Sequence, residues 1–136
     1  MLAQNFMTAK DLALEEKELV ALISLLGLLE REELPHVKYH TLNKDNPINR
    51  NTFGFNMAVW SSATDCGTVC CLGGSAEIIG GFRQKHFCYT RNVELHELFY
   101  PPIGGYTRWK LITTEQAATA LRNYLTTGKA SWSEII

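Results

Sequence analysis

The sequence lacks a run of apolar residues that is long enough to cross a membrane as a helix. Its most apolar window, Leu19 to Leu29, is about half of the ~20 residues that a membrane span needs, and charged residues flank it on both sides. Met1 to Lys10 also lacks the basic region, apolar run and cleavage site of a secretory signal peptide. These absences predict a soluble, cytoplasmic protein without membrane association.

A strong charge of either sign is missing as well. The 13 basic and 14 acidic side chains give a formal net charge of -1. The densest basic stretch, from Arg83 to Arg91, contains one further cation, Lys85, and is interrupted by aromatic residues. Because phosphate binding shows as an excess or a cluster of lysine and arginine, nucleic acid is not an expected partner.

The composition itself is that of a folded protein. A chain of 136 residues is near the common size of one domain, so we expect a single domain over residues 1–136. Hydrophobic residues make up 46% of the chain and charged residues 20%, which is typical of globular proteins and excludes a disordered one.

Apolar residues at three- and four-residue spacing predict a long helix near the N-terminus. Thr8, with Asp11 three residues later, predicts its start, and the apolar stripe runs from Leu12 to Leu29 before Pro35 ends the helix. Four further residues widen the stripe: Leu14, Val20, Leu25 and Leu28. A stripe of this width predicts a helix that is either central or covered on a second side by a partner, such as a second copy in a homodimer. The glutamates near both ends of this helix are expected to be solvated.

The C-terminal part predicts two further helices. Val93 to Tyr100 forms two turns in this interpretation and ends before two prolines. Thr113 and Gln116 make a capping box for a last helix that ends at Gly128, and Trp132 packs the tail back. The inward-facing residues are expected to be Leu95, Leu98, Phe99, Ala117, Ala120, Leu121, Tyr124 and Leu125.

Long connections separate these helices. The polar stretch from His36 to Thr52 is predicted to be a loop, and Phe53 to Trp60 an extended segment or an apolar anchor. Phe82 to Asn92 and Ile103 to Lys110 are also predicted loops.

The segment between these loops is rich in small residues. Thr64 or Asp65 as N-cap and Gly80-Gly81 as exit predict a buried central helix, crossed at Gly73 or Gly74 by the first or last helix. The expected fold is therefore mainly α, with a small-residue central helix and long connecting loops.

The central segment begins at Cys66 with the sequence CGTVCCLG, which resembles the CGTxxCxxG signature of a family of small bacterial and phage proteins. In that family pattern, Cys66 and a cysteine corresponding to Cys70 or Cys71 recur. The resemblance extends, in the same order along the chain, to Phe55-Asn56-Met57 with Trp60, to Leu98-Phe99 and to Thr113–Gly128. It implies a small helical protein and no particular mechanism.

The cysteines allow three interpretations. Without a secretion signal, and with three of the four crowded together, they are expected to be reduced thiols and not a disulfide framework. In a zinc interpretation, Cys66 and Cys70 lie one turn apart on a helix, and His86 and Cys88 complete a tetrahedral site. The alternative function here is a zinc-stabilised helical domain.

In a second interpretation, Cys66 is the nucleophile of a thiol-dependent enzyme. A position in the first turn of a helix lowers the pKa of a thiol. A histidine must then act as base, with His86 or His96 as the candidates and His36 and His40 in the polar loop.

The third interpretation, which we prefer, treats the cysteines as small hydrophobic residues in a tight helix contact. It requires no cofactor and no catalytic residue. The corresponding function is a non-enzymatic accessory protein, of phage or mobile-element type, that acts through a protein partner or a homodimer.

Overall fold

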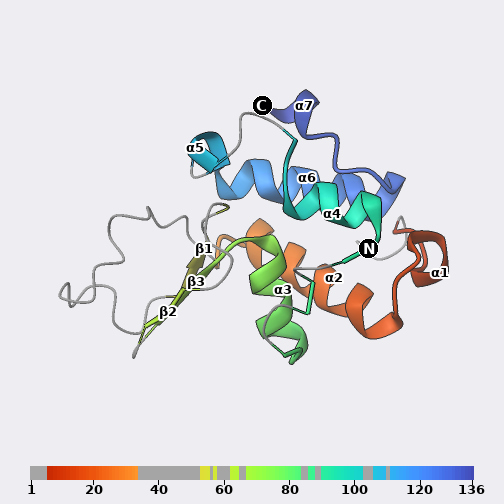
Figure 1. Ribbon diagram of the computed structural model, residues 1–136, viewed down its shortest axis with the longest axis horizontal. Helices are drawn as coiled ribbons and strands as arrows, with labels where there is room; N and C mark the ends of the chain where they lie inside the picture. Colours follow the sequence, from red (N-terminus) through yellow and green to blue (C-terminus); the bar gives the residue numbers. More distant parts are fainter. Residues whose placement is uncertain are drawn as a thin grey trace.

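The computed structural model confirms a mainly α-helical fold (Figure 1). It describes residues 6–33, 53–55, 57, 62–64, 67–83, 86–87, 90–102, 106–109 and 111–136. The polar stretch predicted as a loop, from His36 to Thr52, lies outside these residues. Within them, no helix has both the length and the apolar character needed to span a bilayer.

The predicted N-terminal helix is two helices, α1 (Ala9–Leu12) and α2 (Glu16–Glu30). The Thr8–Asp11 capping box is confirmed, but Ala13 takes a left-handed conformation (φ 55°) and ends α1 after one turn. The side chain of Asn92 donates a hydrogen bond to the carbonyl oxygen of Leu12 (2.8 Å) and so satisfies an acceptor that the break leaves open. The prediction of one continuous helix was therefore wrong.

α2 packs against α3 (Leu72–Gly80) and α6 (Thr114–Thr127), and α6 also packs against α4 (Val93–Phe99). Figure 1 shows α2 and α6 running in opposite directions. The leucines of α2 lie at the centre of the core: Leu19, Leu22, Leu25, Leu26 and Leu29 are buried. Val20 is the large apolar residue of α2 that stays exposed (55%). The width of the apolar stripe is thus explained within one chain, and the homodimer stays a prediction.

The small-residue segment is only partly helical. Gly67–Cys70 forms strand β3, which pairs in parallel with β1 (Phe53–Phe55) and antiparallel with β2 (Ser62–Thr64), in the order β1-β3-β2. The helix predicted from Thr64 was therefore wrong in its first part. The backbone groups of Gly67–Cys70 form hydrogen bonds to two neighbouring strands. These bonds replace the ones that the same groups would make within a helix. The extended alternative for Phe53 to Trp60 holds over β1.

The second part of that segment is the predicted buried helix. α3 begins after Cys71 and ends at Gly81, whose left-handed backbone (φ 70°) confirms the glycine exit. It approaches α2 closely at Gly80, where a Cβ atom would lie 2.9 Å from the Cβ atom of Ala21. Small residues therefore do bring α3 close to the first long helix, while the crossing at Gly73 or Gly74 stays a prediction.

The C-terminal helices agree with the sequence. α4 and α6 have the predicted bounds within a residue, and all of their expected inward-facing residues are buried. α7 (Trp132–Ile135) packs the tail back, with Trp132 buried and its ring N–H donating to the Glu97 carbonyl oxygen (3.0 Å). One correction applies to the loop from Ile103 to Lys110, since Tyr106–Trp109 forms the short helix α5.

Candidate functional site

The cysteine sites were predicted on the assumption that the segment from Cys66 onward is helical, and its first part is a strand. Cys70 lies in strand β3, so it does not share a helical face with Cys66 as the zinc interpretation requires, and the helix that the nucleophile interpretation expects from Thr64 or Asp65 begins only at Leu72. Cys66 and Cys88 lie outside the described residues. Cys71 is buried (2% exposed) at the N-cap of α3, in keeping with the preferred packing role.

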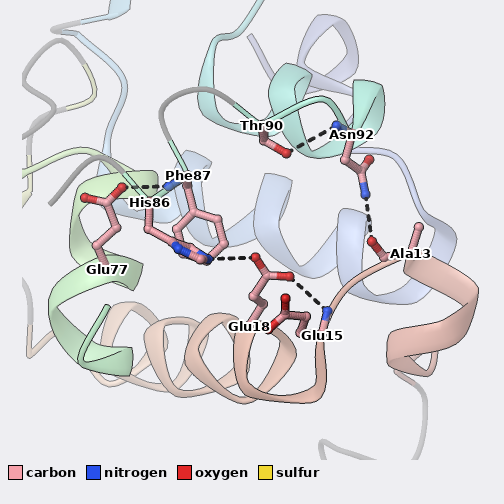
Figure 2. Close-up of polar contacts among 8 residues, drawn as sticks. All are labelled: Ala13, Glu15, Glu18, Glu77, His86, Phe87, Thr90 and Asn92. Atoms are coloured by element: carbon pink, nitrogen blue, oxygen red, sulfur yellow. Dashed lines mark hydrogen bonds and ion pairs between the residues drawn. The ribbon is translucent and has the colours of Figure 1, made fainter. Parts of the chain in front are cut away.

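His86, a candidate in both of those interpretations, is paired with a carboxylate (Figure 2). Its Nε2 atom lies 2.9 Å from Oε2 of Glu18, and its ring stacks on Phe82 at a centroid distance of 4.2 Å. The other oxygen of Glu18 accepts the backbone N–H of Glu15 (2.9 Å) and caps α2. Glu18 therefore connects the start of α2 to the segment between α3 and α4.

A second carboxylate holds the next residue of that segment. Glu77 of α3 is 2% exposed, and its Oε2 accepts the backbone N–H of Phe87 at 2.8 Å. Figure 2 shows the two carboxylates approaching His86 and Phe87 from different helices. Hydrogen bonds from a backbone N–H to a buried carboxylate are among the stronger ones in proteins, so this arrangement fixes the turn at His86. The structure thus places His86 in a turn that two carboxylates hold.

His96, the other candidate base, is exposed on α4, where its ring lies 4.7 Å from that of Tyr100. In the described parts of the chain, no three His, Cys, Asp or Glu side chains are close enough together to hold a metal ion. The zinc site and the thiol nucleophile stay predictions, because Cys66 and Cys88 are not among those parts.

Tyr124 adds an unusual polar group to the core next to Glu18. Its side chain is fully buried in α6, and its hydroxyl has no hydrogen-bond partner among the residues that the structure describes. Burial raises the pKa of the Tyr124 phenol well above its usual value, and the negative charges of Glu18 and Glu94 raise it further. The hydroxyl therefore stays protonated throughout the physiological range.

A surface groove lies at the other end of α2. It has a volume of about 410 Å³ and is formed by the C-terminal end of α2 and the first turns of α6. Leu29 and Ala118, both buried, are its apolar lining residues. The polar lining residues are Glu30, Glu32, Thr114, Glu115, Thr119, Arg122 and Asn123.

The charges of this groove are unequal. Arg122 donates to both carboxylate oxygens of Glu30 at 2.5–2.8 Å, so these two charges compensate each other. Glu32 and Glu115 are exposed and have no cationic partner among the residues that the structure describes. The groove therefore carries an excess of negative charge.

Sequence reasoning missed both regions, having treated the glutamates of α2 as solvated. One signal was present, because Glu15 and Glu18 have the spacing of a capping box. The pairing of Glu18 with His86 joins residues far apart in the chain, and the groove needs two helices side by side, so no local pattern shows either. Comparison with protein-family models, with curated proteins and with solved structures gave no match for this chain.

Proposed function

We propose that this protein is a small, non-enzymatic accessory protein and that it binds a partner protein in the groove between α2 and α6. The groove itself is the observation that supports the proposal. Binding surfaces for peptide segments are typically concave, with an apolar base and a few polar groups at the edge that fix orientation. Leu29 and Ala118 supply such a base, and the side chains of two helices supply the edge.

The walls of the groove are two helices that pack against each other, and a preformed surface of this kind favours binding at low entropic cost. α2 and α6 are held together below it by the core leucines and beside it by the ion pair of Glu30 with Arg122. The side chain of Thr119 bonds within its own helix, to the carbonyl oxygen of Glu115 at 2.9 Å. A partner segment would therefore meet a preformed surface.

The polar region around His86, at the opposite end of α2 from the groove, supports the same kind of function. Glu18 and Glu77 use their carboxylates to hold the chain between α3 and α4, so these groups contribute to the scaffold that carries the groove. A scaffold with its binding surface on rigid helices is what a recognition module needs.

Selection from a random peptide library displayed on phage tests the proposal. Peptides are selected on the full-length protein, and their affinities are measured for two variants. Thr119→Trp places a bulky ring in the groove at an exposed position, and Ser24→Trp places the same ring on an exposed part of α2 away from the groove. We expect Thr119→Trp to abolish binding of the selected peptides and Ser24→Trp to leave it unchanged. Selected peptides that bind both variants equally well would contradict the proposal.

A further inference from the structure

We infer that the partner segment enters the groove through lysine or arginine side chains; this inference rests on the proposed function. The charge of the groove is its basis. Since Glu30 and Arg122 neutralise each other, Glu32 and Glu115 leave an excess of two negative charges on the polar edge. The complementary occupant is a cationic segment.

The backbone around Glu32 adds to the negative potential. α2 ends at Glu30, where its last carbonyl groups carry the partial negative charge of the helix dipole. Cations are the residues that normally stabilise such an end, yet this end carries Glu30, Glu32 and Glu33, and Glu33 pairs with Arg31. Glu32 thus places an uncompensated carboxylate where the backbone is already negative.

Glu32 is also held in a position that glycine usually occupies. It has a left-handed backbone (φ 58°), and the N–H groups of Glu32 and Glu33 close the helix on the carbonyl oxygens of Leu29 (3.2 Å) and Leu28 (2.9 Å). A glycine would adopt this backbone without strain. Glutamate therefore lowers the stability of the fold at this position compared with glycine. Its carboxylate, which lines the groove, is available for binding a partner.

The apolar base suits the same side chains. Lysine and arginine have long apolar stems with a charged group at the end, and they pack the stem on apolar surface while the charge reaches a polar edge. Leu29 and Ala118 lie at the base of the groove, with Glu32 on one wall and Glu115 on the other. A segment with two cationic residues would satisfy both carboxylates.

An NMR titration of the full-length, ¹⁵N-labelled protein tests the inference. The probes are a short acetylated peptide that alternates lysine with leucine and a twin in which glutamine replaces each lysine. We expect the lysine peptide to shift the amide signals of residues 29–32 and 114–123, and the glutamine twin to bind about three- to tenfold more weakly, as expected for the loss of two exposed charge pairs.

Two double variants carry the control. Glu32→Gln with Glu115→Gln removes the two groove charges, and we expect it to weaken binding of the lysine peptide about three- to tenfold. Glu97→Gln with Glu134→Gln removes the same net charge at exposed positions outside the groove lining and should leave the affinity within about twofold. Equal loss in both double variants would overturn the inference, because the attraction would then come from net charge alone.

The failure of this inference is distinguishable from that of the proposed function. If library peptides lose binding to Thr119→Trp but carry no excess of lysine or arginine, the groove is a binding surface and the inferred partner chemistry is wrong. If they bind Thr119→Trp normally, the groove itself is not the binding surface.

Discussion

α2 and α6 lie side by side and antiparallel, but their ends are built from different residues. α6 begins at Thr113 with a capping box to Gln116 and ends at Gly128, whose backbone is left-handed (φ 88°). α2 begins with a capping box of two glutamates, Glu15 and Glu18, and is followed by a left-handed Glu32. Glutamates therefore take the N-cap position of α2 and the left-handed position after its C-terminal end, where α6 has threonine and glycine.

The difference separates local from tertiary roles. The terminal residues of α6 bond within their own helix and stabilise it. Those of α2 have a second role, because Glu18 pairs with His86 and Glu32 lines the groove. Four experiments on these two helices, from the largest expected effect to the smallest, test whether α2 gives up local stability for these contacts.

The largest difference is expected at the two capping boxes. Glu18→Ala removes the cap on Glu15 and the partner of His86, which is exposed, so we expect a loss of about 1.5 kcal/mol in the free energy of unfolding. Gln116→Ala removes only the reciprocal bond of a capping box and should cost about 0.5 kcal/mol. Urea unfolding measures both.

A conservative variant separates the two roles of Glu18. Glu18→Gln keeps an oxygen for the Glu15 N–H but loses the charge that faces His86. The free energy of unfolding of Glu18→Gln should lie between that of the wild type and that of Glu18→Ala. Equal losses for Glu18→Ala and Gln116→Ala would show that the contact with His86 contributes nothing to stability.

The second comparison is at the C-terminal ends of α2 and α6, where we expect changes in stability of opposite sign. Gly128→Ala forces a Cβ atom into a left-handed backbone with no steric contact closer than 3.6 Å, so its cost of about 1 kcal/mol is conformational. Glu32→Gly relieves the same strain in α2 and should raise stability by up to about 1 kcal/mol. Thermal unfolding measures both, and the midpoint should fall for Gly128→Ala and rise for Glu32→Gly.

Glu32→Gly also connects stability to binding. The variant removes one of the two uncompensated groove charges, so a protein of higher stability should bind the lysine peptide more weakly. If Glu32→Gly lowers stability, Glu32 is not a strained residue and the contrast with Gly128 is lost.

The sequence predicts what local signals specify. The start of α6 follows from Thr113 and Gln116, its end from Gly128, and the buried face of α4 from the spacing of Leu95 and Leu98. In these elements the side-chain pattern, the caps and the packing agree, so each one indicates the same bounds.

The errors arise where distant residues decide the local structure. The apolar spacing continues through Ala13, and the break there is stabilised by Asn92, about 80 positions away along the chain. Gly67–Cys70 contains residues compatible with a helix or a strand, and the pairing with Phe53–Phe55 selects the strand. The groove was not predictable for the same reason, because Glu32 and Glu115 meet only in the folded chain.

The third comparison concerns the buried faces. α2 places leucines in the core, whereas α6 places Tyr124 there with a hydroxyl that bonds to no group in the described part of the chain. Tyr124→Phe removes this unsatisfied group without changing the shape of the ring, so we expect the free energy of unfolding to rise by up to about 1 kcal/mol. A loss of more than 1 kcal/mol would instead indicate that an ordered water bonds to the hydroxyl.

The pH dependence of the same variant checks the cause. The pKa of Tyr124 is raised in the folded state. The unfolded chain therefore releases this proton at a lower pH than the folded protein does, near the ordinary tyrosine pKa of 10.0. Wild-type stability should therefore be complete below pH 10 and decrease as the pH rises above it. Tyr124→Phe should lack this part of the decrease, which chemical unfolding at pH 8 and at pH 10.5 measures.

The smallest effect is expected for the ion pair that joins the two helices. Glu30 and Arg122 form a bidentate contact, but about a third of each side chain is exposed, so solvent screens their attraction. Glu30→Gln should lower the free energy of unfolding by about 0.5 kcal/mol or less, and the loss should disappear at high salt.

Its effect on binding should be larger than its effect on stability. Without Glu30, the guanidinium of Arg122 is uncompensated and cancels one of the two free carboxylates of the groove, although it keeps its cation–π contact with Phe6. Affinity for the lysine peptide should therefore fall in Glu30→Gln and recover in a double variant with Arg122→Gln, because the net charge of the groove edge returns to its original value. A double variant that binds no better than Glu30→Gln would show that Glu30 contacts the peptide directly and that α2 presents two binding carboxylates.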